Sequence, residues 1–243
     1  MNCWHPDGRP CELADVLGLS PAKPARVIAA VGAGGKTSTL YDLAEAGAAR
    51  GLSCIVTTTT HMSMRPDLLS DLAGILDRLA PGAILTVGSR LSSDKFGPLS
   101  SAEMDQIGQH ADLILVEADG SRQLPLKVPA EHEPVIPAEA DTLLVLLGLS
   151  AVNQPLAVVC HRLPLALAIL GDENRATAEN CARLLQEGYL ENKKVLDWQA
   201  GKREVHVVLN QADSEARRKQ GAAIAAGVDA SVLLTTRKPE HEA

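Results

Sequence analysis

The sequence predicts an α/β protein with a doubly wound, mainly parallel sheet and helices on both faces. Apolar segments of strand length alternate with segments of helical periodicity, which is the pattern of successive βαβ units. Several strand segments are apolar throughout, as expected of strands that are buried on both faces. Aromatic residues make up only 2% of the chain, so we expect Leu, Val, Ile and Ala to form the core.

The expected elements follow from the local composition along the chain. The first strand segment is the apolar run at residues 27–31, and the segment after it has Leu40, Leu43, Ala44 and Gly47 at helical spacing. By the same criteria we expect strands at residues 26–31, 52–59, 83–88, 112–117, 141–148, 204–209 and 230–235. We expect helices at residues 36–50, 66–79, 100–109, 174–187 and 214–226.

Residues 1–243 are predicted to form a single domain, since a chain of this length can bury a substantial core. Residues 150–203 have a weaker, mostly helical pattern, so a small helical insertion there is an alternative. Residues 120–140 contain four prolines and the run Glu131-His132-Glu133, which predicts an irregular loop. A loop of this length in a compact domain is more often functional than idle.

The turn after the first strand reads Gly32-Ala33-Gly34-Gly35-Lys36-Thr37-Ser38. A strand, a glycine-rich turn and a helix that opens on Lys-Thr can hold a phosphate chain, because backbone N–H groups and the helix N-terminus face the anion. We expect Lys36, outside the core, to reach the β- and γ-phosphates and Thr37 to bind Mg²⁺. The longer Walker A pattern is not met, because Ala30 stands at its first glycine, but the shorter G-x-x-G-K-[ST] pattern of Mur-type ligases fits. The expected fold is therefore P-loop NTPase-like; the alternative is a tight turn without a ligand.

The strand at residues 112–117 runs into acidic residues, Glu117 and Asp119. A carboxylate that binds Mg²⁺ directly or through water occupies this place in phosphate-loop enzymes. Both side chains point the same way because residues two apart share a face of a strand. Either one is a candidate metal ligand, and the other a candidate base or water-orienting group. The alternative is an acidic turn with no ligand.

Two further segments follow strand ends. The run Thr57-Thr58-Thr59-Thr60-His61 comes after the second strand, where Thr58 is a candidate Mg²⁺ ligand and His61 a candidate for positioning water or substrate. Asn210 and Asp213 follow a late strand in the pattern N-x-x-D, which resembles the guanine-specificity element of GTPases, although Gln211 replaces its usual lysine. The bound nucleotide is therefore expected to be ATP or GTP.

Four blocks of this sequence together resemble the YqeC family: Val31 to Ser38, Thr57 to Met62, Val116 to Arg122, and Pro125 to Pro137. The resemblance spans nearly the whole chain, and its fourth block is the most distinctive. Members are described as accessory factors of selenium-dependent molybdenum hydroxylases. The resemblance implies a role in maturing such a hydroxylase or its cofactor, with that enzyme or its maturation proteins as partners.

Arg122 and Lys127 are cations on the loop after the acidic strand. We expect them to neutralise charge during phosphoryl transfer or to bind an anionic substrate. The leading hypothesis is therefore Mg²⁺-dependent hydrolysis of a nucleoside triphosphate or transfer of its γ-phosphate. The alternatives are an ATP-dependent Mur-like ligase or kinase, and a nucleotide-gated chaperone that barely hydrolyses its nucleotide.

Charge and hydropathy exclude other classes of protein. The net charge of −7 argues against nucleic-acid binding. No apolar run reaches the length of a membrane span, and the first residues lack the pattern of a signal peptide. The five cysteines form no C-x-x-C pair, as expected in a reducing compartment. We therefore expect a cytoplasmic protein without a membrane or nucleic-acid partner.

Overall fold

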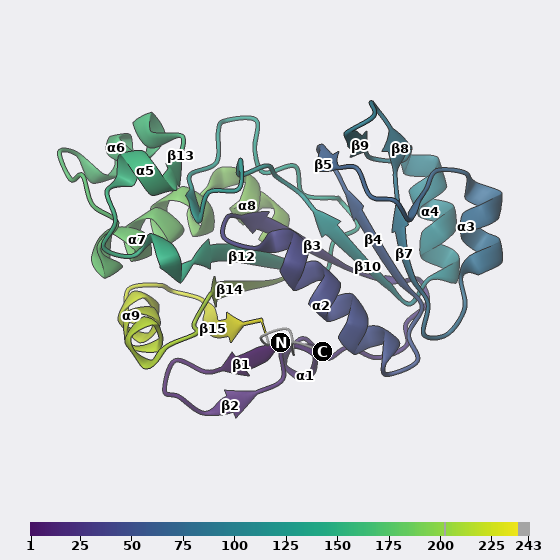
Figure 1. Cartoon of the computed structure of the whole chain (residues 1–243), viewed down its shortest axis with the longest axis horizontal. Helices are drawn as coiled ribbons and strands as arrows, with labels where there is room; N and C mark the ends of the chain where they lie inside the picture. Colours follow the sequence, from purple (N-terminus) through teal and green to yellow (C-terminus); the bar gives the residue numbers. More distant parts are fainter. Residues whose placement is uncertain (202, 238–243) are drawn as a thin grey trace.

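The computed structural model describes residues 1–201 and 203–237, and its architecture confirms the predicted fold class (Figure 1). The described residues form one ten-stranded sheet and two small ones. All neighbours from β15 to β6 in the large sheet are parallel, while β1 and β2 add an antiparallel edge. The order across this sheet is β2 (Pro10–Cys11), β1 (Asn2–Trp4), β15 (Ser231–Thr236), β14 (Glu204–Asn210), β12 (Thr142–Gly148), β3 (Arg26–Gly32), β10 (Leu113–Glu117), β4 (Cys54–Thr58), β7 (Ile84–Val87) and β6 (Leu68–Leu69).

The small sheets and the helices complete the fold. One small sheet pairs β5 (Met62–Ser63), β9 (Lys95–Gly97) and β8 (Ser89–Arg90), and the other pairs β11 (Leu126–Lys127) with β13 (Cys160–His161). The helices are α1 (Leu13–Val16), α2 (Lys36–Ala48), α3 (Leu72–Arg78), α4 (Ser101–His110), α5 (Leu156–Val159), α6 (Leu163–Leu170), α7 (Ala178–Leu185), α8 (Lys193–Gln199) and α9 (Glu215–Ala225). A 3₁₀ turn spans Leu149–Ala151 and a π-helical turn spans Gln186–Leu190.

Successive residues of the central strands face two separate apolar layers. Ile28 and Ala30 of β3 face the layer that contains Leu40 of α2, and α1 closes its rim. Ala29 and Val31 face the opposite layer, to which α4, α7, α8 and α9 contribute. Figure 1 shows α2 crossing one face of the sheet, with α8 behind it. The central strands are therefore buried on both faces, which explains their continuous apolar composition.

The parallel arrangement brings the predicted functional segments to one edge of the sheet. The carboxyl ends of β3, β10, β4, β12 and β14 all lie there. Glu117 at the end of β10 is opposite Ala30 of β3 on one side and Thr58 of β4 on the other. The glycine-rich turn follows β3 directly, so the acidic strand end lies next to it.

The seven expected strands all form, but two expected helices have different bounds. The helix predicted at residues 66–79 is wrong in its first half, because Leu68 and Leu69 pair with β7. Helix α3 begins only after Asp71, whose carboxylate accepts a hydrogen bond from Gly74 N at 2.6 Å. The helix predicted at residues 174–187 begins after its cap Thr177 and continues as the π-helical turn.

Residues 150–201 are mostly helical, and their buried side chains join the main core. Leu156, Ala166 and Leu184 lie in the same apolar layer as Val145 of β12. How the chain divides into domains stays a prediction. In the part of the chain that the structure describes, no helix combines the length and apolar composition that crossing a bilayer requires.

Candidate functional site

The glycine-rich turn is held tightly against the ends of β12 and β14. Gly34 and Gly35 have φ angles of +85° and +121°. A Cβ atom on Gly34 would lie 2.2 Å from Gly148 N, and one on Gly35 would lie 2.3 Å from Asn210 Nδ2. These close approaches and the left-handed backbone require glycine at both positions.

At the start of α2, several backbone N–H groups have no hydrogen-bond acceptor among the described residues. Its N-cap is Gly35, which supplies no capping side chain, and its first turn carries no acidic residue. Backbone N–H groups of residues 34–38 donate to no group in the described part of the chain, whereas Gly32 N and Ala33 N donate to Asp119 and Leu146. Such a set of N–H groups without acceptors, at the positive end of a helix dipole, suits an anion.

Lys36 is buried, with 4% of its surface exposed, so the expectation that it lies outside the core is wrong. Its Nζ donates a hydrogen bond to Gly32 O at 2.7 Å and lies 3.1 Å from Asp119 Oδ1. Burial is tolerated because Asp119 compensates the ammonium charge. In this structure the lysine of the turn is therefore held by protein groups.

Asp119 is the centre of a buried ionic network. Its side chain has no exposed surface, and Oδ2 accepts a hydrogen bond from Gly32 N at 3.0 Å. Lys127 Nζ lies 2.8 Å from the same oxygen, and Tyr189 OH donates to it at 3.4 Å. Burial and the nearby Asp119 raise the pKa of Tyr189 well above its usual range, which keeps this phenol a neutral donor. Two ammonium groups thus flank one carboxylate.

Lys127 extends this network away from the turn. Its side chain is fully buried, and Nζ lies 2.8 Å from Glu133 Oε2. Arg162 donates two hydrogen bonds to Glu133, at 2.7 and 2.9 Å. Burial alone would raise the pKa of Glu133, but its contacts with Lys127 and Arg162 outweigh burial and lower that pKa. Glu133 is therefore held as a carboxylate between two cations.

Glu117 forms a separate contact with the start of α2. Thr37 Oγ1 donates to Glu117 Oε2 at 2.6 Å, and Thr58 Oγ1 donates to Glu117 O at 2.8 Å. Burial raises the pKa of Glu117, although Lys36 and Thr37 oppose that shift. The described residues hold no group of three or more His, Cys, Asp and Glu side chains placed around a metal. A metal here would need ligands besides protein carboxylates.

The two residues of the N-x-x-D pattern lie in different surroundings. Asn210 Nδ2 donates to Gly34 O at 2.9 Å, while its Oδ1 accepts from Thr235 Oγ1 at 3.1 Å, so Asn210 braces the glycine-rich turn. Asp213 is exposed and paired with Arg217 at 2.6 Å. Guanine recognition by Asp213 stays a prediction.

The remaining predicted site residues are Ser38, His61 and Arg122, which lie outside the buried ionic network around Asp119. Ser38 is half-buried in the first turn of α2, whereas His61 and Arg122 are exposed. In residues 1–201 and 203–237, no hydrogen bond or ion pair joins His61 or Arg122 to the network. Arg122 has a φ angle of +51°. Burial lowers the pKa of the His161 imidazole, and the charges of Arg162, Lys127 and Arg122 lower it further.

Three residues of the network escaped sequence analysis: Glu133, Arg162 and Tyr189. Glu133 was visible only as part of an acidic run in a loop, and Tyr189 projects from a π-helical turn, a feature often found at functional sites. Arg162 is the N-cap of α6 with a φ of +72°. The sequence did carry one sign of Glu133: it is a charged residue within a proline-rich connection and stands among apolar residues.

The lowered pKa of Glu133 predicts an acid-dependent contribution to stability. At neutral pH, Glu133→Gln should lower the free energy of unfolding by about 3 kcal/mol, because Lys127 loses one buried partner. Since the folded pKa lies below the ordinary value of 4.5, the wild-type advantage is present above that pH and disappears as pH falls through the folded pKa. Chemical denaturation at several pH values measures this difference.

The matched control is Glu131→Gln, which removes an exposed carboxylate of the same loop. It should match wild type at every pH. A Glu133→Gln variant as stable as wild type at neutral pH would contradict the role assigned to this carboxylate.

Comparison with known proteins connects this site to a family. The family described as YqeC protein matches residues 28–164, which include the glycine-rich turn, Asp119, Lys127, Glu133 and Arg162. Over 142 residues the chain is 37% identical to the "Uncharacterized protein YqeC" of Escherichia coli (strain K12), covering 55% of this chain and 56% of that protein. The chain thus aligns with little more than half the length of this relative. The matched segment contains most of the buried network, and the chain belongs to the YqeC family.

Proposed function

We propose that this protein binds a Mg²⁺-nucleoside triphosphate at residues 32–38 and hydrolyses it or transfers its γ-phosphate. The observation that carries the proposal is the set of free N–H groups of residues 34–38 at the uncapped start of α2. Their number suits several phosphate oxygens, and Lys36 adds a cation beside them. A tight turn without a ligand would need neither the free donors nor the buried lysine.

The oxygen atoms of Glu117 and Thr37 fit a Mg²⁺ ion. They lie 2.6 Å apart at the end of β10 and the start of α2. Mg²⁺ usually takes one or two protein oxygens and fills its other positions with water and substrate phosphates, which agrees with the absence of a larger ligand cluster in the described residues. When bound, the ion neutralises charge on the phosphates. Thr58 would support Glu117 through the main-chain oxygen.

Asp119 suits a different role from Glu117. Its charge is already compensated by Lys36 and Lys127, and one oxygen is used by Gly32 N. A bound triphosphate would draw Lys36 toward its oxygens, while Lys127 would keep Asp119 neutralised. Asp119 therefore positions Lys36 and the turn, and Lys127 acts through Asp119. Arg122 and His61, both exposed, are the candidates for contact with the transferred group or water.

The proposed cellular role rests on what the YqeC resemblance implies. We infer an accessory function in the maturation of a selenium-dependent molybdenum hydroxylase or its cofactor, in the cytoplasm, with that enzyme or its maturation proteins as partners. The family match to residues 28–164 supports this inference. Turnover that rises when the partner hydroxylase is added would support it, and turnover unchanged by the partner would contradict it.

A nucleotide-gated binding protein is the second candidate function. The observation in its favour is that the network from Lys36 ends at Arg162, at the start of α6. Val158, Leu165 and Leu167, on α5 and α6, are exposed large apolar residues. Slow single turnover without a partner would favour this function over steady hydrolysis.

Lys36→Met tests the proposed phosphate site. This variant should lose the rise in melting temperature that MgATP or MgGTP gives wild type, which corresponds to about 2.7 kcal/mol at a concentration of 100 Kd. Lys36 also pairs with buried Asp119, so the unliganded variant should itself be less stable. The shift is therefore measured against the same variant without nucleotide. Lys95→Met, an exposed lysine, should keep the full shift, and an unchanged shift in Lys36→Met would contradict the proposed site.

Glu117 and Asp119 should give opposite signatures. Glu117→Gln should need at least about tenfold more Mg²⁺, which corresponds to about 1.4 kcal/mol, for the same nucleotide-induced stabilisation. Because the pKa of Glu117 is raised in the folded protein, its ionised form destabilises the folded state at neutral pH. Unliganded Glu117→Gln should therefore be as stable as wild type or more so. Asp119→Asn should instead be strongly destabilised, since Lys36 and Lys127 lose their shared partner. Thermal melts across a Mg²⁺ titration measure both effects, and identical behaviour of the two variants would contradict the assignment.

The choice of base tests Asp213. If Asp213 accepts hydrogen bonds from guanine, GTP should bind at least about a hundredfold more tightly than ATP, since each charge-assisted bond contributes about 1.5–3 kcal/mol. Asp213→Asn should then weaken GTP and favour xanthosine triphosphate. Arg217→Ala, which frees Asp213 from its ion pair, serves as the control and should not weaken GTP. Equal binding of ATP and GTP to wild type would make ATP the default nucleotide.

A further inference from the structure

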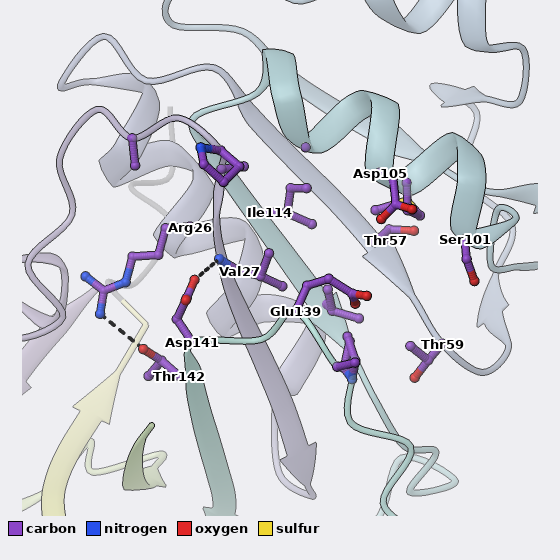
Figure 2. Close-up of a pocket in the computed structure, with 18 of the residues that line it drawn as sticks. Arg26, Val27, Thr57, Thr59, Ser101, Asp105, Ile114, Glu139, Asp141 and Thr142 are labelled. Atoms are coloured by element: carbon purple, nitrogen blue, oxygen red, sulfur yellow. Dashed lines mark hydrogen bonds between the residues drawn. The ribbon is translucent and has the colours of Figure 1, made fainter. Parts of the chain in front are cut away.

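A cavity of about 1080 Å³ lies on the face of the sheet opposite α2, and Figure 2 shows residues that line it. It runs from Thr57–Thr59, at the carboxyl end of β4, to Arg26 and Thr142, the first residues of β3 and β12, at the amino ends of those strands. The connection from β10 to β12, all of which the structure describes, contains β11 but no helix. The cavity therefore occupies space that a crossover helix would fill in a regular doubly wound fold.

The floor and one wall of the cavity are apolar. Val27 of β3 and Ile114 and Val116 of β10 form the floor. Leu99 and Met104, just before and within α4, form part of a wall. Figure 2 shows Ile114 to the left of the α4 residues Asp105 and Ser101. This volume and lining are those of small-molecule sites, in which an apolar body is oriented by a few polar groups.

The charged groups of the lining leave a surplus of carboxylates. The lining contains four acidic side chains and two arginines. Both arginines are engaged: Arg26 with Thr142 and Glu204, and Arg203 with the carbonyl oxygens of Ala138 and Trp198. Asp141 accepts a hydrogen bond from Val27 N at 2.8 Å.

Two carboxylates and one hydroxyl of the lining lack partners. Asp105 and Glu139 are exposed residues of the lining, and within the described residues no side-chain hydrogen bond or ion pair involves either of them. Thr57 Oγ1 is buried without a hydrogen-bond partner, and only 3% of the residue is exposed. Its neighbours differ, since Thr58 donates to Glu117 O and Thr59 donates to Val135 O. Thr57 and Asp105 both line the cavity. A buried hydroxyl without a partner is costly unless a ligand supplies one.

We propose that this cavity binds a small organic cation, an apolar body that carries an amino or amidinium group. The apolar body rests on Val27, Ile114 and Val116, and the cation lies against Asp105 and Glu139. A small rotation of Thr57 lets its hydroxyl bond a polar atom of the ligand. The site lies on a sheet face rather than at the glycine-rich turn, so it does not depend on the proposed nucleotide function.

Saturation-transfer NMR with the full chain and no nucleotide tests the proposal, with tryptamine as the probe. Tryptamine should receive saturation from the protein, whereas indole-3-acetate, which has the same ring and the opposite charge, should not. Spermidine, which has the charge without an apolar ring, should bind more weakly than tryptamine. Asp105→Asn/Glu139→Gln should weaken tryptamine at least about tenfold, because charge-assisted hydrogen bonds are lost.

The matched control is Asp77→Asn/Glu131→Gln, which removes the same charges from exposed positions outside the cavity and should leave the affinity unchanged. Thr57→Val should weaken tryptamine yet raise the melting temperature, since it deletes an unpartnered buried hydroxyl. Thr58→Val should lower the melting temperature, because its hydroxyl is bonded. Equal signals from tryptamine and indole-3-acetate, no signal from either, an equal loss in the control variant, or dimerisation that fills the groove would overturn the proposal.

Discussion

The buried charge of Asp119 is the constraint on which the rest of the site depends. A carboxylate with no exposed surface is stable only if cations and donors surround it, and here these are Lys36, Lys127, Gly32 N and Tyr189 OH. They come from α2, β11, β3 and the π-helical turn. One charge therefore fixes the positions of four segments that are far apart in the sequence. The strand ends place Asp119, and Asp119 in turn places the lysine of the glycine-rich turn.

The same network connects the turn to α6. Lys127 lies between Asp119 and Glu133, and Arg162 at the start of α6 completes the pairing of Glu133. If a triphosphate draws Lys36 away, Lys127 is the one cation that still compensates Asp119. Lys127 is then shared differently between Asp119 and Glu133. When Lys36 turns to a ligand, Lys127 still pairs with Asp119 and Arg162 still pairs with Glu133. This is why the network can lose Lys36 to a ligand without leaving an uncompensated carboxylate.

The sequence predicted the central sheet and the turn because their signals are local. Each of these features can be recognised from a few consecutive residues: the continuous apolar runs, the glycines at 34 and 35, and the strand ends at Glu117 and Thr58. The burial of Lys36 and the roles of three other residues, Glu133, Arg162 and Tyr189, depend on contacts between residues far apart in the sequence. Asp119 and Tyr189 are 70 residues apart, and Glu133 and Arg162 are 29 residues apart. No local pattern encodes such pairs. The two- and three-residue strands escaped for the opposite reason, since they are too short to show any period.

The connection from β10 to β12 explains both proposed sites. A helix there would satisfy its own backbone, cover the sheet face and carry no side chain to Asp119. The prolines at 125, 129, 134 and 137 prevent a helix, so the chain instead forms β11 and loops. This irregular path delivers Lys127 and Glu133 to the buried network and leaves Val27, Ile114 and Val116 at the floor of a cavity. The absence of one regular element thus supplies the cation that balances Asp119 and also the space in which a second ligand fits.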